Sequence, residues 1–241
     1  MKIAILSDIH GNFWALDAVL RDLEVREPDL IVNLGDSLYG PLDPMGTFDI
    51  IRSLPIVSIA GNEDRLILER NHESPTLEFV MNELNAKAMD WLSSLPSTLT
   101  VMSSFFLCHG TPLSDTTYLL ENVQGKNISA RDPKEVESLL AGVTAKLVLC
   151  GHSHLPRIVQ AGGKLVVNPG SVGCPAFDDD HPNLHMVENH SPHARYALLD
   201  YAEGMKGIEH VIVPYDHEKA ARQAEKNQRP DWAKWLRTGR V

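Results

Sequence analysis

The amino-acid sequence predicts an α/β protein built around a largely parallel sheet. Apolar segments at residues 2–6, 29–34 and 55–60 have the pattern of buried strands, and helical patterns lie between them. A strand, a helix and a second strand in succession form a right-handed crossover, which makes the two strands parallel. Because 43% of the 241 residues are hydrophobic, the chain has enough apolar side chains for a substantial core.

In the first half of the chain the expected strands and helices alternate. Apolar residues at helical spacing predict helices over residues 13–26 and 44–53. A longer helical pattern runs from residue 76 to 95, where Pro96 ends it. The apolar segments "TLTVM" and "FFLCHG" then predict a hairpin-like pair of strands.

The second half mixes strands with polar segments. In order, we expect a turn-rich segment at 111–132, a helix at 133–141, the strand "KLVLCGH", the hairpin of "PRIVQ" and "KLVVN", the strands "ARYALLDY" and "IEHVIVPY", and a charged helix at 216–227. No repeat or low-complexity linker marks a boundary, so a single domain over 1–241 is expected.

Charge and targeting signals narrow the function classes. The net charge is −10 and no long run of Lys or Arg occurs, so we expect no broad nucleic-acid surface. The first apolar run ends at Ser7, which is too early for a signal peptide or a membrane span, and we expect a cytoplasmic protein without a membrane partner. Cys108, Cys150 and Cys174 are an odd number, which argues against a disulfide framework.

Polar side chains of the same chemistry follow six apolar strands. The carboxyl ends of strands in an α/β sheet form the usual ligand site, so these groups are expected to converge although they are far apart in sequence. The candidate metal ligands are Asp8, His10, Asp36, Asn62, His109, His152 and His154. These seven residues follow five of the strands, and the sixth strand end, "VVNPGS", offers Asn168 to the same edge.

Imidazole and carboxylate groups together suit Zn, Fe, Mn, Ni or Co. Each residue alone has an ordinary explanation, because a lone Asp at a strand end is often a helix cap and a lone buried His is often a core residue. Seven candidates exceed what one four-coordinate ion takes, whereas two ions sharing one carboxylate would use all of them. The sequence therefore favours a site for two divalent metal ions.

With these residues identified, the chain resembles the calcineurin-like metallophosphoesterase superfamily, in its small prokaryotic phosphodiesterase branch. The blocks "SDIHGN", "GD", "GNED", "HG", "GHSH" and "NPGSVG" occur in family order and cover about residues 1–173. The resemblance implies a four-layer αββα sandwich of two mixed sheets flanked by helices. It also implies a dinuclear metal centre, with Mn, Fe, Zn or Ni as the ions, at the carboxyl ends of the strands.

The resemblance also implies a role for each candidate ligand. It places Asp8, His10 and His154 on one ion and Asn62, His109 and His152 on the other, with Asp36 bridging the two. Asp36, Asn62 and His109 would be the catalytic residues, because a hydroxide held between the ions would attack phosphorus in line. Two divalent ions, two carboxylates and one hydroxide leave about one positive charge, which suits a phosphodiester.

The residue after Asn62 departs from the family pattern. Many relatives have His there as the proton donor to the leaving oxygen, and this chain has Glu63. We expect nearby cations to keep Glu63 ionised and a poor general acid, so substrates with good leaving groups are favoured. For the next residue, Asp64, a helix N-cap is preferred over a catalytic role.

Other residues are candidates for contact with the substrate. Tyr39 is expected either to stack on a base or aryl group or to pack in a simple turn. The NPGSVG block would present Asn168 to the site or only support GHSH, and Arg65 and Arg157 are candidates for phosphate recognition. Two segments, about 111–132 and 175–194, are possible caps, and the second is expected to be a solvated His-rich loop over the site.

The function expected from the sequence is hydrolysis of phosphodiester or nucleotide pyrophosphate-type bonds in a small phosphoester or nucleotide substrate. Two alternatives stay open: a phosphomonoesterase acting on nucleotides or small phosphates, and a non-catalytic metal-binding scaffold. The terminal segment "RPDWAKWLR" is expected to be a packed helix or a subunit contact rather than a platform for a nucleobase.

Overall fold

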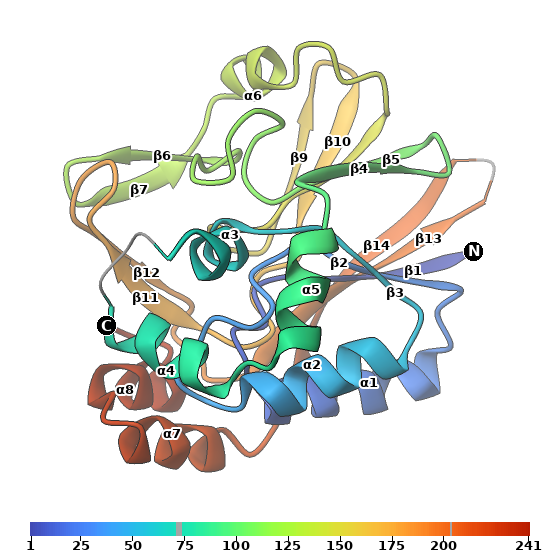
Figure 1. Cartoon of the computed structure of the whole chain (residues 1–241). Coiled ribbons are helices and arrows are strands. Elements are labelled where there is room, and N and C mark those ends of the chain that lie inside the picture. Colours follow the sequence, from blue (N-terminus) through green and yellow to red (C-terminus); the bar gives the residue numbers. More distant parts are fainter. Residues whose placement is uncertain (71–73, 203) are drawn as a thin grey trace.

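The computed structural model describes residues 1–70, 74–202 and 204–241, and it shows two five-stranded mixed sheets packed against each other with helices on both outer faces (Figure 1). The four layers expected from the family resemblance are therefore confirmed. The parallel character expected from the alternating strands and helices holds for three adjacent strands in each sheet, and the other two strands are antiparallel to their neighbours.

The first sheet has the strand order β14-β13-β1-β2-β3. Its strands are β1 (Lys2–Leu6), β2 (Leu30–Asn33), β3 (Ile56–Ser58), β13 (Ala194–Tyr201) and β14 (Met205–Val213). The strands β1, β2 and β3 are parallel, with Ile5 paired to Val32. On the other side of β1, β13 is antiparallel and pairs Ala4 with Leu198.

The second sheet has the strand order β4-β5-β8-β10-β9. Its strands are β4 (Thr98–Val101), β5 (Phe105–Cys108), β8 (Leu147–Leu149), β9 (Arg157–Ala161) and β10 (Lys164–Asn168). The central strands β5, β8 and β10 are parallel, and both edge strands are antiparallel to their neighbours. The two expected hairpins, β4–β5 and β9–β10, are both present.

Alternation along the strands explains the layers. Ile3 and Ile5 of β1 point between the sheets, where they meet Leu107 of β5, whereas Ala4 and Leu6 point to the helices on the other face. The helices are α1 (Phe13–Arg26), α2 (Pro44–Ser53), α3 (Asn62–Glu69), α4 (Pro75–Glu83), α5 (Ala86–Ser94), α6 (Pro133–Leu139), α7 (His217–Lys226) and α8 (Pro230–Thr238).

Three expectations about individual segments need correction. The single helix expected over 76–95 is two helices, because the Asn85 side chain accepts a hydrogen bond from Ala88 N and begins α5 as its N-cap. The segment 111–132 contains a hairpin of β6 (Glu121–Gln124) and β7 (Asn127–Ala130). The His-rich segment forms the hairpin of β11 (Ala176–Asp179) and β12 (His185–Glu188), in which His185 is buried.

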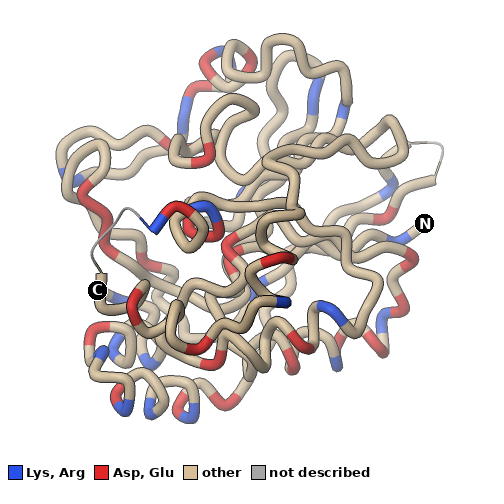
Figure 2. The backbone as a smooth tube through the Cα atoms, in the orientation of Figure 1, with Lys and Arg blue, Asp and Glu red and all other residues tan. Residues whose placement is uncertain are grey.

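The described part of the chain has positive and negative side chains interspersed and no helix suited to a membrane. Lys and Arg lie among Asp and Glu in the view of Figure 2 rather than on one broad basic face. Within residues 1–70, 74–202 and 204–241, no helix has the length and the apolar content that crossing a membrane requires. The three cysteines are free thiols, and all are buried.

Candidate metal centre

The seven predicted ligands come together where strands of both sheets end. Asp8 and His10 follow β1, Asp36 follows β2, and Asn62 begins α3 just after β3. From the second sheet, His109 follows β5, and His152 and His154 follow β8. The convergence follows from the parallel centres of both sheets, whose carboxyl ends share one edge of the sandwich.

The backbone at this edge is unusual. A left-handed conformation is uncommon for a residue other than glycine, and such residues gather at functional sites because the surrounding structure must hold them there. Five predicted ligands have φ between 52° and 67°: Asp8, His10, Asp36, His152 and His154. Hydrogen bonds hold two of them, because Asp8 N donates to Gly35 O and His10 N donates to Asp36 O.

Glycines allow the ligand loops to approach one another. A Cβ at Gly61 would lie 2.2 Å from Asp36 Oδ1, and a Cβ at Gly151 would lie 2.0 Å from Ser7 Oγ. Both distances are far below any real van der Waals contact. The glycines of GNED and GHSH are therefore required by close packing against neighbouring loops.

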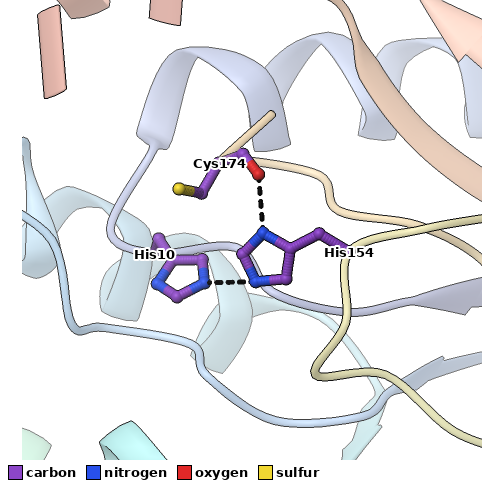
Figure 3. A group of neighbouring side chains, drawn as sticks. All are labelled: His10, His154 and Cys174. Atoms are coloured by element: carbon purple, nitrogen blue, oxygen red, sulfur yellow. Dashed lines mark hydrogen bonds between the residues drawn. The ribbon is translucent and has the colours of Figure 1, made fainter. Parts of the chain in front are cut away.

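The first half of the site contains His10, His154 and Asp8. His154 Nε2 lies 3.1 Å from His10 Nε2 and 3.3 Å from Asp8 Oδ1. The other ring nitrogens are anchored on the backbone, since His10 Nδ1 donates to Tyr39 O at 2.9 Å and His154 Nδ1 donates to Cys174 O at 2.7 Å (Figure 3). Both imidazoles thus turn Nε2 toward Asp8.

The second half contains Asp36, Asn62, His109 and His152. His109 Nε2 lies 3.2 Å from Asp36 Oδ2 and 2.9 Å from Asn62 Oδ1, while its Nδ1 donates to Leu34 O at 2.8 Å. One ligand atom each from Asp36, His109 and His152 lie within 4.8 Å of one another, and so do those of Asp8, His10 and Asp36. Asp36 belongs to both groups, which is the position expected of a bridging carboxylate.

The donor set fits divalent metal ions. Asp8 Oδ1 and His152 Nε2 are buried and have no hydrogen-bond partner. Unsatisfied polar atoms of this kind cost free energy unless a bound group satisfies them. A cation between these imidazoles and carboxylates would do so, and the mixture of nitrogen and oxygen donors suits transition metals rather than Ca²⁺ or Mg²⁺.

Burial and neighbouring charges oppose each other at the histidines. Burial disfavours the imidazolium form of His10, but Glu63 and Asp36 outweigh burial and raise the pKa of His10 to about 9. Burial acts in the same direction at His109, where Asp36 raises the pKa to about 10. At His152, burial and the nearby His109 lower the pKa to about 4.

Burial would by itself raise the pKa of Asp8, but His154 and His109 hold it well below its usual range. Asp8 is therefore a carboxylate throughout the neutral range, and it offers negative charge to a cation. That charge is the electrostatic requirement for holding a divalent ion in a buried site.

Glu63 lies against a predicted ligand rather than free in solvent. Its Oε2 is 3.0 Å from His10 Nδ1, on the side of the ring that faces away from Asp8 and His154. Burial raises the pKa of Glu63 to about 7, although His10 pulls it down. The expectation that Glu63 is ionised depends on bound cations and stays a prediction.

Asp64 has a structural role beside the site. The N-cap of α3 is Gly61 rather than the predicted Asp64. The carboxylate of Asp64, in the first turn, accepts hydrogen bonds from Gly61 N at 3.1 Å and Ser37 N at 3.0 Å. It therefore ties the start of α3 to the loop that carries Asp36.

Two residues predicted to contact the substrate have partners within the protein, so their contact with a substrate stays a prediction. The Asn168 side chain donates to Gly151 O and Ser153 Oγ, so it supports the GHSH loop, which was the other reading of its block. Arg65 forms two hydrogen bonds with Asp115, at 2.7 and 3.1 Å. Neither side chain lines the cavity above the ligands.

Arg157 and Tyr39 have different outcomes. Arg157 is bound to the buried Glu121 at 2.9 Å and does not line the cavity, so it is not placed to recognise a phosphate there. Tyr39 does line the cavity, but it is 7% exposed and its hydroxyl shares a hydrogen bond with Ser74 Oγ. Its predicted stacking on a base or aryl group stays a prediction.

A cavity of about 590 Å³ opens above the predicted ligands. The sequence singled out Glu63 and Tyr39 among its lining residues, but it did not assign to the site Cys174, Phe177, Arg229, Trp232 and Trp235. The segment 175–194, predicted as a cap, contributes part of the wall through β11. The segment 111–132, also predicted as a cap, contributes no lining residue, but its Tyr118 packs on a predicted ligand, with ring centroids of Tyr118 and His152 4.7 Å apart.

Cys174 follows the NPGSVG block and lies above His10 and His154 in Figure 3, with its carbonyl oxygen directed at the His154 ring. Its sulfur and one ring nitrogen each of His10 and His154 lie within 4.8 Å of one another. Burial raises the pKa of the Cys174 thiol well above its usual value, and Sγ donates to Ala176 O. The sequence held no signal for this neighbour, because Cys174 has no metal-like spacing to another cysteine.

Comparisons with known proteins agree with this architecture. A model of the calcineurin-like phosphoesterase superfamily domain matches residues 1–204. An uncharacterized protein of Methanocaldococcus jannaschii is 28% identical, over 95% of this chain and 94% of that protein.

Two solved structures have a similar fold. A metallophosphoesterase from Sphaerobacter thermophilus is 22% identical with a TM-score of 0.78, covering 99% of this chain and 100% of that one. A hypothetical protein from Pyrococcus horikoshii OT3 is 22% identical with a TM-score of 0.77, covering 99% and 98%. At these identities the likeness shows the fold alone.

The sandwich of two mixed sheets, with His and Asp side chains gathered at one edge, defines a protein of the metallophosphoesterase class. The chain belongs to the calcineurin-like phosphoesterase superfamily. Members of this family are hydrolases that depend on divalent metal ions, and the present chain has a His and Asp cluster that could hold them.

Proposed function

We propose that this protein hydrolyses phosphodiester or nucleotide pyrophosphate-type bonds at a centre of two divalent metal ions. The observation that carries the proposal is the meeting of seven donor side chains, with Asp36 common to two groups, beside an open cavity that five of them line. A structural role alone would leave Asp8 Oδ1 and His152 Nε2 buried without partners.

The proposed roles follow the two groups of side chains. Asp8, His10 and His154 would hold one ion, Asn62, His109 and His152 the other, and Asp36 both. Two divalent ions, with Mn, Fe, Zn or Ni as candidates, would supply a hydroxide nucleophile at neutral pH and neutralise the phosphoryl oxygens.

The chain's own residues set the geometry of that reaction. Backbone carbonyls of Tyr39, Leu34 and Cys174 accept the Nδ1 protons of three histidines and leave each Nε2 for an ion. Asp8 and Asp36 are the two carboxylates of the set, so a centre with two divalent ions keeps a small positive charge. A diester carries one negative charge and suits that balance better than a dianionic monoester.

Departure of the leaving group has no histidine donor in the GNED loop. Glu63 occupies that position and its carboxyl is directed at His10. We infer that the enzyme favours substrates whose leaving oxygen departs without a proton, such as aryl esters. Phosphoserine and phosphothreonine esters of proteins, whose alkoxide leaving groups need protonation, are disfavoured for the same reason.

The proposal is tested with bis(p-nitrophenyl) phosphate and p-nitrophenyl phosphate. Metal-stripped protein receives Mn²⁺, Ni²⁺, Fe²⁺ or Zn²⁺ one at a time, and p-nitrophenol release is followed. We expect metal-dependent diester hydrolysis with a higher kcat/KM than for the monoester, lost in Asp36→Ala and His109→Ala. A preference for the monoester would support the phosphomonoesterase alternative, and two bound ions without turnover would support the scaffold.

A further inference from the structure

The end of the chain forms one wall of the cavity above the candidate metal centre. The family model stops at residue 204, whereas Arg229, Trp232 and Trp235 line the cavity from α8 and the residue before it. In Figure 1, α8 lies beside the β11–β12 hairpin, which contributes Phe177 to the same cavity. Part of this wall therefore comes from a segment that lies beyond the residues matched by the family model.

The wall is aromatic where it meets the predicted ligands. The ring centroids of Phe177 and His154 lie 4.5 Å apart, and those of Trp232 and His10 lie 5.9 Å apart. Trp235 packs on Trp232 with ring centroids 5.5 Å apart. A substituent of a phosphate bound at the centre would thus extend directly along aromatic side chains.

Positive charge on this wall is already neutralised. Among the described lining residues Arg229 is the one Lys or Arg, and its guanidinium forms hydrogen bonds of 2.6–3.2 Å with the Asp231 carboxylate. The guanidinium carbon also lies 5.9 Å from the centre of the Trp232 ring. The molecule itself therefore places a cation against this aromatic wall.

Negative charge on the side of the cavity formed by β11 and the residue after it is not neutralised in this way. Asp178, Asp179 and Asp180 line the cavity in succession from the end of β11, and none forms an ion pair with a residue in the described ranges. An anionic substituent, such as the further phosphates of a nucleotide, would meet three carboxylates and no available cation. A cationic substituent would meet carboxylates and aromatic faces together.

We propose that the cavity binds phosphodiesters in which one esterified alcohol carries an ammonium group, with the phosphate at the metal centre and the ammonium directed at the 178–180 carboxylates. The proposal rests on the proposed phosphodiesterase function and narrows its substrate class. Carboxylates supply the charge, and Phe177 and Trp235 supply apolar and π surface for the methylene or methyl groups around the nitrogen.

The test compares two aryl diesters that differ in one charge. They are p-nitrophenyl phosphocholine and its 3,3-dimethylbutyl isostere, in which a carbon replaces the quaternary nitrogen. With the metal-reconstituted protein at low ionic strength, we expect kcat/KM for the choline ester to be at least tenfold higher, and the preference to shrink as salt screens the carboxylates. Equal rates, or a preference for the isostere, would overturn the proposal.

The variant D178N/D179N/D180N tests which residues read the charge. We expect the ratio of the two kcat/KM values to fall toward one in this variant. The matched control D49N/E83Q/D90N removes the same number of charges from exposed positions outside the cavity, and it should keep the wild-type ratio. A preference that survives in D178N/D179N/D180N would contradict the assignment.

The two proposals fail in different ways. Hydrolysis of both esters without a preference for the choline ester would overturn the substrate class and leave the phosphodiesterase function standing. Hydrolysis of neither ester by protein that holds two metal ions would overturn the phosphodiesterase function, and the substrate class with it.

Discussion

Metal binding at this site should displace protons from histidines. The pKa of His10 is raised to about 9, so at pH 7 its imidazole is protonated in the metal-stripped protein and must lose that proton to accept an ion. The difference of about two units, 9 minus 7, weakens the apparent affinity of that half of the site about 100-fold, or about 3 kcal/mol. His109, with a pKa of about 10, adds a similar requirement to the other half.

The sign of the pH dependence follows. Affinity rises by about tenfold per pH unit as the pH increases toward about 9, and it falls as the pH is lowered, because the raised pKa values favour the proton over the ion. Isothermal titration of Mn²⁺ at pH 7, in buffers of different ionisation enthalpy, counts the protons released. We expect at least two per chain.

Variants locate the released protons. His10→Asn should lower the count by about one. The control His190→Asn changes an exposed histidine with the same left-handed backbone, φ 53° at both positions, and should leave the count unchanged. Glu63→Gln removes the largest charge that raises the pKa of His10, so it should flatten the pH dependence. Release of less than one proton per chain at pH 7 would refute this reasoning.

Two further predictions concern packing and a buried ion pair. Gly61→Ala should lower diester hydrolysis by at least tenfold and destabilise the fold by about 1–3 kcal/mol in urea unfolding, because the added Cβ would overlap Asp36. The control Gly207→Ala, which has open space around the added Cβ, should match the wild type in both measurements. Arg157→Met should lower the free energy of unfolding in urea by on the order of 3 kcal/mol, because it leaves the Glu121 carboxylate, which is 1% exposed, without its charged partner. An unchanged urea midpoint would show that this ion pair does not stabilise the fold.

The convergence of the candidate ligands could be predicted from the sequence because these residues follow strands. Each of Asp8, Asp36 and His109 lies within three residues of the end of an apolar strand, and the parallel arrangement of the strands determines where such ends meet. The glycines of GNED and GHSH stand beside candidate ligands in the sequence. The close approach of neighbouring loops that requires glycine there becomes visible only in the packed structure.

The sequence failed where partners come from distant segments. The sequence alone left Arg65 as a candidate phosphate ligand, because it does not show that Asp115, fifty positions away, binds the Arg65 guanidinium. The amide of Asn168 is used by Gly151 and Ser153, a choice made by the packing of two loops. Trp235 has helical spacing to Trp232 and was correctly expected to pack, but its place in the cavity wall depends on how α8 docks.

Helix boundaries show a similar limit. The apolar pattern over 76–95 is continuous, so periodicity alone could not separate α4 from α5. Asn85 holds the signal, since its side chain caps α5 and competes with a continuous helix. The β11–β12 hairpin was hidden by its acidic and histidine-rich composition, which is typical of a solvated loop.

The central claim is that one carboxylate, Asp36, joins two metal ions at the shared edge of the two sheets. Anomalous diffraction from crystals grown with Mn²⁺, measured above and below the manganese edge, tests it most directly. Two peaks per chain are predicted, one on each side of the Asp36 carboxylate, the first beside His10 and His154 and the second beside His109 and His152. A single peak, or two peaks that do not share Asp36, would contradict the claim.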